Sequence, residues 1–460
     1  MAPVFEQIVT REEGLGYLAD GLSDFVSSYG EKMPAKELFT LFEAYRQFGE
    51  EERMEKLADA AFVQYKDSLL SKEVARALYG VMLENSVSRL ETYASCAYHH
   101  FLQYGLSLSE RAEFGFEAVD MGNIFHDVLE RFVGYLEGSG YTWFDFPPQF
   151  AETNVKAALE EIAVSYGAGI LYHSARSEYA ISRMERILNR SLLTLQNHLQ
   201  KGDFKPEGYE VSFHYAKDLE AVSIALSEDE KMRLKGRIDR IDVAEDADNL
   251  YVKIIDYKSG DKQFDLAALY RGLQLQLVVY MNAAVEMMAK KRPDKHVVPA
   301  AILYYHVSDP MVETQGEISG EELNQRILEE LRMKGVVNAD DGIVDKLDRF
   351  MGDKSDVIPV EKKKDGTFSA RSKVMSSEEL GYVSQFVSEK VRTLGKEIMA
   401  GHIAHNPYED GNRSACSFCA YKKVCGFDTT IPGFTMREFE KLSEEEILTR
   451  MKQEVSSHGI

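Results

Sequence analysis

Two aspartates and a lysine near the middle of the 460-residue chain have the types and spacing of a metal-dependent hydrolase site. Asp239 lies in the segment GRIDRID, and Asp256 and Lys258 lie in the segment IIDYKSG, which follows a short acidic turn. Residues two apart in a strand share a face, so Asp256 and Lys258 are predicted to point the same way. A hairpin of the two segments would also bring Asp239 close to Asp256.

Two carboxylates this close repel each other unless a cation lies between them. Oxygen ligands favour Mg²⁺ or Mn²⁺. A lysine beside two carboxylates stays protonated, because opposite charge favours its charged form. Lys258 is therefore predicted to orient water and to stabilise negative charge that develops on a phosphate. The alternative for these residues is a solvated hairpin with a surface ion pair.

Helices on both sides of the hairpin carry further candidate residues. Residues 119–137 have apolar side chains at helical spacing and contain His126, whose neutral imidazole could bind a divalent ion. Taken alone, His126 would be interpreted as a buried structural histidine. Residues 266–290 predict one long helix, on which Gln276 and Tyr280 lie four apart and share a face.

The cysteines predict a second site. Cys416, Cys419 and Cys425 have the spacing Cys-x2-Cys-x5-Cys, and Cys96 is the only other cysteine in the sequence. In a long cytosolic chain, cysteines indicate metal binding or reactivity more than disulfides. A zinc ion and an iron–sulfur cluster can both be bound by four thiolates, so the spacing alone does not favour one metal site over the other.

The net charge and the distribution of basic and apolar residues indicate which partners and which location to expect. The net charge of −22 opposes nonspecific capture of DNA, although binding to DNA needs only a local basic path. Residues 290–292, 362–364 and 422–423 are basic patches that could form such a path or an ordinary solvated face. No apolar run approaches the roughly 20 residues that span a membrane, and no charged-then-apolar leader is present, so we expect no membrane association and a cytoplasmic location. No Gly-x-x-x-x-Gly-Lys-[Ser/Thr] loop occurs, so we expect no ATP hydrolysis.

The order Gly-x-Ile-Asp at residues 236–239 and Asp-x-Lys at residues 256–258 resembles the PD-(D/E)XK nuclease core, and more narrowly the RecB-like nuclease family. That family also has a Gly-x-x-x-His motif, matched by Gly122 and His126, and a later Gln-x-x-x-Tyr motif. The resemblance implies an Mg²⁺-dependent deoxyribonuclease, with Mn²⁺ as the alternative ion. The implied metal ligands are His126, Asp239, Asp256 and the carbonyl of Tyr257. The implied catalytic group is Asp239, Asp256, Lys258, Gln276 and Tyr280.

One branch of the RecB-like family has a cysteine before the nuclease core and three after it, an arrangement called an iron staple. The same layout occurs in this sequence. The resemblance therefore implies a [4Fe–4S] cluster bound by Cys96, Cys416, Cys419 and Cys425.

From about residue 10 to about residue 440, the order of these motifs resembles the C-terminal part of the AddB family. Members of that family are subunits of the AddAB helicase–nucleases of bacterial recombinational repair. The resemblance implies DNA as the substrate, a heterodimer with an AddA-type helicase–nuclease subunit, and exonucleolytic degradation of the 5′-terminated strand in double-strand break repair by homologous recombination. One alternative is a non-catalytic DNA-binding or scaffold subunit whose nuclease core has decayed. Another is a zinc-stapled nuclease of a different pathway.

The predicted fold is α/β, with a restriction-endonuclease-like PD-(D/E)XK core, a mixed central sheet flanked by helices, and a helical N-terminal segment. Residues 1–86 are expected to be a helical remnant of a helicase-like region. Residues 87–428 are expected to form the nuclease domain closed by the cysteine staple, and residues 429–460 a tail with a short charged helix. Residues 320–355 are predicted to be helical and charged.

Overall fold

In this computed structural model the chain divides into two units. The first comprises Met1–Ser68 and His405–Glu438, and the second comprises Leu69–Ala404 and Phe439–Ile460. The predicted domain boundaries at residues 86 and 428 remain predictions. The structure describes residues 8–28, 30–63, 65–66, 69–111, 118–165, 175–213, 219, 221–313, 316–411 and 413–457.

The second unit is built on a six-stranded sheet with the order β2-β5-β6-β7-β8-β9. β6 pairs parallel with β7 and β8 pairs parallel with β9, whereas the other neighbours are antiparallel. This arrangement confirms the predicted mixed central sheet. The strands are β2 (Lys205–Ser212), β5 (Arg237–Glu245), β6 (Asn249–Lys258), β7 (His296–His306), β8 (Lys334–Asn338) and β9 (Val374–Met375).

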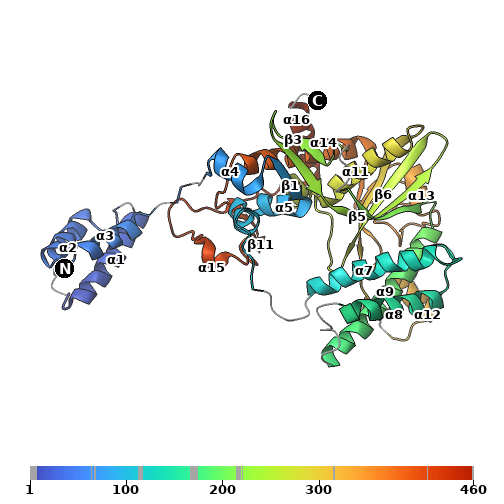
Figure 1. Cartoon of the computed structure of the whole chain (residues 1–460), viewed down its shortest axis with the longest axis horizontal. Helices are drawn as coiled ribbons and strands as arrows, with labels where there is room; N and C mark the ends of the chain where they lie inside the picture. The colour runs from blue at the N-terminus through green and yellow to red at the C-terminus, as the bar shows by residue number, and fades with distance from the viewer. Residues whose placement is uncertain are drawn as a thin grey trace. The chain divides into compact units, whose positions relative to one another are not determined.

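Helices cover both faces of this sheet (Figure 1). β6 shows why, because its side chains alternate between two apolar cores. Val252 and Ile254 pack into one core, and Ile255 and Tyr257 pack into the other. The first core is completed by α5 (Val87–Ser95), α10 (Leu266–Tyr270), α11 (Gln276–Lys291), α14 (Ser377–Met399) and α16 (Glu444–Ser457). The second is completed by α7 (Ala118–Glu137), α8 (Pro148–Ser165), α9 (Ala175–Gln200) and α13 (Asp341–Leu347).

A second, three-stranded sheet has the order β1-β4-β3. Its strands are β1 (Met82–Ser86), β4 (Lys231–Lys235) and β3 (Ser223–Ala225), and the short helix α4 (Lys72–Tyr79) precedes β1. The prediction that residues 1–86 are helical is therefore wrong at β1. The side chains of Met82–Ser86 alternate in burial, and the segment becomes a strand by pairing with β4, far along the chain. After α5 come α6 (Ala97–His100) and the π-helix η2 (Phe101–Gly105).

The predicted single helix over residues 266–290 is two helices, α10 and α11, separated by a turn. Gly272 in this turn has a φ of 83°, a left-handed conformation that glycine adopts without steric cost. A Cβ atom at Gly272 would lie 3.1 Å from the Cβ of Ala94 on α5. The break makes Gln276 the first residue of α11.

The prediction that residues 320–355 are helical is wrong at β8 (Lys334–Asn338). Helix α12 (Gly320–Glu330) is followed by β8 and then by α13. Four of the five residues of β8 are buried, and the strand pairs with both β7 and β9. A short apolar run that is buried on both faces has no alternating pattern, so periodicity cannot distinguish it from a buried helix turn.

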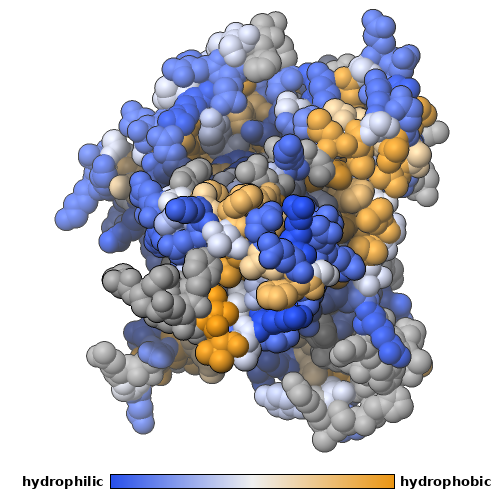
Figure 2. All heavy atoms as spheres, turned by 90° about the vertical axis from the view of Figure 1, so that its left-hand side faces the viewer, coloured by the Kyte–Doolittle hydropathy of each residue, from blue (hydrophilic) through white to orange (hydrophobic). Residues whose placement is uncertain are grey.

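The first unit contains three helices that share an apolar core and a segment that carries three of the cysteines. The helices are α1 (Arg11–Ser28), α2 (Ala35–Gln47) and α3 (Glu51–Ala61), and the cysteine segment holds β10 (Tyr408–Asp410), β11 (Arg413–Ser414), α15 (Lys422–Cys425) and β12 (Arg437–Glu438). Figure 2 shows hydrophobic side chains in patches among hydrophilic ones on the face that it draws. Within the described residues, no helix combines the length and apolar character that a membrane span requires.

Candidate active site

The hairpin of β5 and β6 places the two predicted carboxylates side by side. Arg240 pairs with Ile255, so the next pair along this register is Asp239 with Asp256. Both aspartates are buried, with exposed fractions of 7% and 1%. The backbone N–H of Tyr257 donates a hydrogen bond to Oδ2 of Asp239 at 2.6 Å. The hairpin therefore brings Asp239 and Asp256 together, as the spacing predicted, and the backbone N–H of Tyr257 lies beside them.

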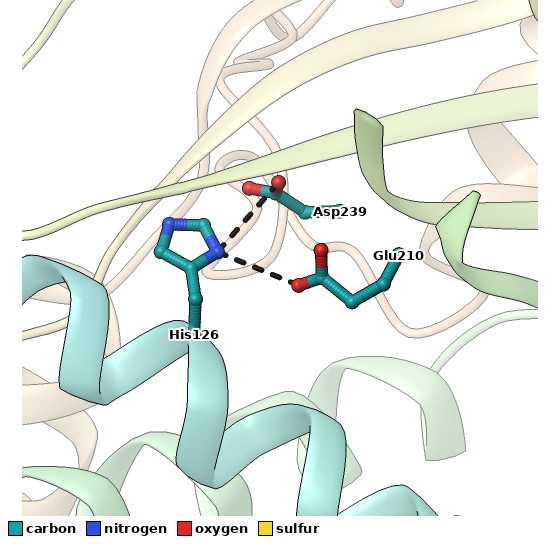
Figure 3. A group of neighbouring side chains, drawn as sticks. All are labelled: His126, Glu210 and Asp239. Atoms are coloured by element: carbon teal, nitrogen blue, oxygen red, sulfur yellow. Dashed lines mark ion pairs between the residues drawn. The ribbon is translucent and has the colours of Figure 1, made fainter. Parts of the chain in front are cut away.

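A histidine and a glutamate complete a group of possible ligands around Asp239 (Figure 3). On α7, Nδ1 of His126 lies 3.5 Å from Oε1 of Glu210 and 3.6 Å from Oδ1 of Asp239. One ligand atom from each residue lies within 4.8 Å of the other two. An imidazole with two carboxylates is a donor set that suits Mg²⁺ or Mn²⁺. These residues therefore fit a site for a divalent cation.

Glu210 was not predicted from the sequence. It lies in β2 between Tyr209 and Val211, whose partners on β5 flank Asp239. Its φ is 46°, a left-handed conformation that costs a residue with a Cβ roughly 1–2 kcal/mol. Such conformations persist where the surrounding structure imposes them, often at functional sites. No local sequence signal distinguishes Glu210 from an ordinary strand glutamate, because its partners come from distant segments.

Gly122 gives the Gly-x-x-x-His pattern a steric basis. A Cβ atom at Gly122 would lie 3.2 Å from Oγ of Ser259, the residue directly after Lys258. Helix α7 therefore approaches the end of β6 closely, one helical turn before His126. This approach places His126 beside the end of the hairpin.

Asp256 is held from its other side by Lys258 and Gln276. Nζ of Lys258 lies 2.5 Å from Oδ2 of Asp256, and Nε2 of Gln276 donates to Oδ1 at 3.0 Å. The same Nε2 lies 3.0 Å from the hydroxyl oxygen of Tyr280. Nζ of Lys258 also lies 3.5 Å from Oε1 of Gln276. One network therefore joins the predicted Asp-x-Lys and Gln-x-x-x-Tyr motifs.

The crowding of acidic groups changes their protonation. Burial, and then repulsion from Asp256, raises the pKa of Asp239 to about 7. Burial lowers the pKa of His126, but the hydrogen bond with Glu210 and the charge of Asp239 outweigh this effect, and the net shift is upward. The Nε atom of Arg237 pairs with Glu210 at 2.5 Å and offsets part of the negative charge. A divalent cation bound among these groups would relieve the remaining repulsion.

Four of the eight cations in the predicted basic patches are paired with carboxylates. Lys290 pairs with Glu286, Lys291 with Glu207, Arg292 with Glu245 and Lys362 with Asp341. On α9, Arg186 and Arg190 both lie within ion-pair distance of Asp309. These pairs match an ordinary solvated surface better than a preformed path for phosphates.

Three of the four cysteines converge in the first unit. Cys416, Cys419 and Cys425 line a single pocket. Burial raises the pKa of the Cys419 thiol, and the neighbouring Cys425 adds to this effect. Cys96 follows α5 in the second unit. Among the residues described, none of the four cysteines forms a disulfide. A site made of all four cysteines remains a prediction.

Comparison with known protein families agrees with this geometry. The model of the PD-(D/E)XK nuclease superfamily matches residues 84–426, a range that contains α7, the hairpin, α11 and the C-terminal cysteines. The chain belongs to the PD-(D/E)XK nuclease superfamily. The predicted fold class is thereby confirmed.

Within this superfamily, the chain is similar to curated proteins of one kind. The chain is 39% identical to the AddB subunit of the ATP-dependent helicase/deoxyribonuclease from Lachnoclostridium phytofermentans, over 99% of this chain and 39% of that protein. The corresponding subunits from Alkaliphilus oremlandii and Bacillus mycoides are 34% and 35% identical, over 88% of this chain and 35% of their own lengths. These relatives confirm the predicted resemblance to AddB, and the chain spans less than two fifths of the length of each.

Proposed function

We propose that this superfamily member is the nuclease part of an AddB-type subunit and that it hydrolyses DNA phosphodiesters with Mg²⁺ or Mn²⁺. The observation that carries the proposal is the group of His126, Glu210 and Asp239 directly beside Asp256 and Lys258. Surface ion pairs do not usually gather three acidic groups and a histidine in one place, because the burial of like charges is costly.

Each residue of the group has a role that follows from its position. His126, Glu210, Asp239, Asp256 and the carbonyl of Tyr257 would hold the ion, which when bound supplies Lewis-acid stabilisation and activates water. The Lys258 ammonium, which lies against Asp256, orients the attacking water and stabilises the charge that develops on the phosphate. Gln276 fixes the carboxylate of Asp256, and Tyr280 supports Gln276.

The finer parts of the proposal concern the cofactor and the partner. We infer a [4Fe–4S] cluster bound by Cys96, Cys416, Cys419 and Cys425, supported by the three thiols that line one pocket. The relatives are named as subunits of an ATP-dependent helicase/deoxyribonuclease, which supports a heterodimer with an AddA-type subunit. In that complex the chain would act as an exonuclease on the 5′-terminated strand during recombinational repair.

Cleavage of single-stranded DNA with and without Mg²⁺ tests the proposal. Asp256→Ala should abolish the Mg²⁺-dependent cleavage, because Asp256 faces the proposed ion. Lys258→Ala should slow it by about 100-fold or more, the usual effect of the loss of one stabilising charge. Asp248→Ala, in the exposed turn of the same hairpin, is the matched control and should retain wild-type activity. Equal activity of the wild type and both site variants would contradict the assignment, and binding of DNA without cleavage would favour the scaffold alternative.

A further inference from the structure

Glu91, on α5, lies outside the ligand group and contacts the start of α11. Its Oε1 accepts a hydrogen bond from the backbone N–H of Leu275 at 2.7 Å and another from that of Gln276 at 3.1 Å. The first N–H groups of a helix have no partner within the helix, and Leu275 provides no side-chain cap for α11. Glu91 therefore supplies this cap from a position 184 residues earlier in the chain.

A second contact fixes the same turn against α5. Ala94 lies one helical turn after Glu91, and its Cβ lies 3.1 Å from the position that a Cβ of Gly272 would occupy. Gly272 belongs to the turn that ends at Leu275. Helix α5 is itself anchored, because Leu90 and Ala94 are buried in the first core. The start of α11 is thus held at two points by α5, a helix packed into the first core.

The start of α11 carries the side chain that holds Asp256. Gln276 is the first residue of this helix, and its Nε2 donates to both Oδ1 of Asp256 and the hydroxyl of Tyr280. Glu91 binds the backbone N–H of this same Gln276. A chain of two hydrogen bonds therefore runs from Glu91 through Gln276 to Asp256.

The surroundings of Glu91 connect it to the lysines that border the proposed site. Burial raises the pKa of Glu91, and the nearby Lys262, the two backbone N–H groups and Lys258 offset part of this shift. Nζ of Lys262 lies 5.2 Å from the centre of the Tyr304 ring, and Tyr304 pairs with Asp256 across β6 and β7. Glu91 therefore belongs to the same electrostatic environment as Asp256.

We propose that Glu91 is a positioning residue of the nuclease site, which fixes Gln276 and through it the carboxylate of Asp256. This inference rests on the proposed function, because it assigns Asp256 to that site. Glu91 does not itself contact the ligand group; its effect on catalysis passes through Gln276.

Variants of the full chain test this role by cleavage of single-stranded DNA with Mn²⁺ or Mg²⁺. Glu91→Asp shortens the side chain and withdraws the carboxylate from the two N–H groups, so kcat should fall about 10-fold or more while the KM for DNA changes little. Glu91→Gln retains an oxygen that can accept the same two bonds, so it should keep most of the activity. Thr92→Ala, on the adjacent position of α5, is the control and should match the wild type.

A double-mutant cycle shows whether Glu91 acts through Gln276. Residues that act through one network give non-additive effects. Glu91→Asp combined with Gln276→Ala should therefore be no slower than Gln276→Ala alone. The inference would be overturned if the double variant were slower than Gln276→Ala by the full factor that Glu91→Asp causes alone. A Glu91→Gln variant as slow as Glu91→Asp would also overturn it. Thermal unfolding of each variant, followed by circular dichroism, identifies any loss of activity that comes from unfolding.

Binding of Mn²⁺ in the absence of DNA separates this inference from the proposed function. If the wild type binds Mn²⁺ but does not cleave DNA, the proposed function fails. The inference still predicts that Glu91→Asp and Gln276→Ala weaken Mn²⁺ binding by similar factors, because both release Asp256. Unchanged Mn²⁺ affinity in Glu91→Asp would overturn it.

Discussion

Substitution of Glu210, whose backbone is left-handed, tests whether this residue belongs to the proposed ligand group. Its Oε1 lies 3.5 Å from His126, and its other carboxylate oxygen pairs with Arg237. Glu210→Gln removes one negative charge from the group but keeps the size of the side chain. We expect the Mg²⁺ concentration for half-maximal cleavage to rise about 10-fold or more, with a smaller change at saturating Mg²⁺.

The control for this variant is Glu207→Gln on the same strand, where the carboxylate pairs with Lys291 at the surface. This variant should bind Mg²⁺ like the wild type, because a surface ion pair contributes little. A metal requirement of Glu210→Gln equal to that of the wild type would show that Glu210 is not a ligand, whatever its backbone conformation.

Helix α9 carries a buried histidine that should make the protein sensitive to acid. His198 is 3% exposed, and neither ring nitrogen has a hydrogen-bond partner among the described residues. Burial, and then repulsion from Lys253, lowers its pKa to about 3. The unfolded chain binds a proton at His198 below about pH 6.5, whereas the folded chain does so only near pH 3. The contribution of neutral His198 to stability is therefore fully present above pH 6.5 and is lost as the pH falls towards 3.

Urea unfolding at pH 7.5 and pH 5.5 measures this effect. For the wild type, His198 should contribute a loss of about 1 kcal/mol in the free energy of unfolding between the two pH values. His198→Phe removes the titrating group and should show a loss smaller by that amount. The rest of the pH dependence, including that of the buried His100, remains in both proteins and serves as the internal reference. An equal loss in both proteins would contradict the assignment of a neutral His198.

For the chain as a whole, the inferred cluster should couple iron content to folding. Protein purified without oxygen is expected to contain iron and sulfide, and Cys96→Ala should lose both and unfold at a lower temperature. The reason is that a ligand set joining Cys96 to Cys416, Cys419 and Cys425 closes a very long loop, and this cross-link lowers the entropy of the unfolded chain. Stoichiometric zinc without iron in such a preparation would contradict the cluster assignment.

The net charge of −22 predicts how the chain behaves without a partner. An acidic protein gathers DNA poorly, because nonspecific binding depends on cations that neutralise phosphates. We expect weak cleavage of single-stranded DNA that falls as salt rises and does not respond to ATP, since the sequence lacks a phosphate loop. A time course on duplex and single-stranded DNA, with and without ATP and an AddA-type subunit, checks this. Rapid ATP-stimulated degradation of duplex DNA by the chain alone would contradict the prediction.

The sequence by itself determined the hairpin and the elements with strong local patterns. Asp239 and Asp256 come together because two strands joined by a short turn can pair in few registers, and alternation fixes which side chains share a face. Helix α7 and its His126 follow from apolar residues at helical spacing. In each case the relevant neighbours are close in sequence or follow one periodicity.

Only the tertiary structure decided the features that depend on distant partners. Glu210 joins the ligand group because β2 pairs with β5, and Glu91 caps α11 because α5 packs against a turn 184 residues later. The break at Gly272 and the strand β8 likewise result from packing against segments that no local pattern identifies. Local propensity differs by only about 1 kcal/mol between alternatives, so burial and pairing across the fold outweigh it.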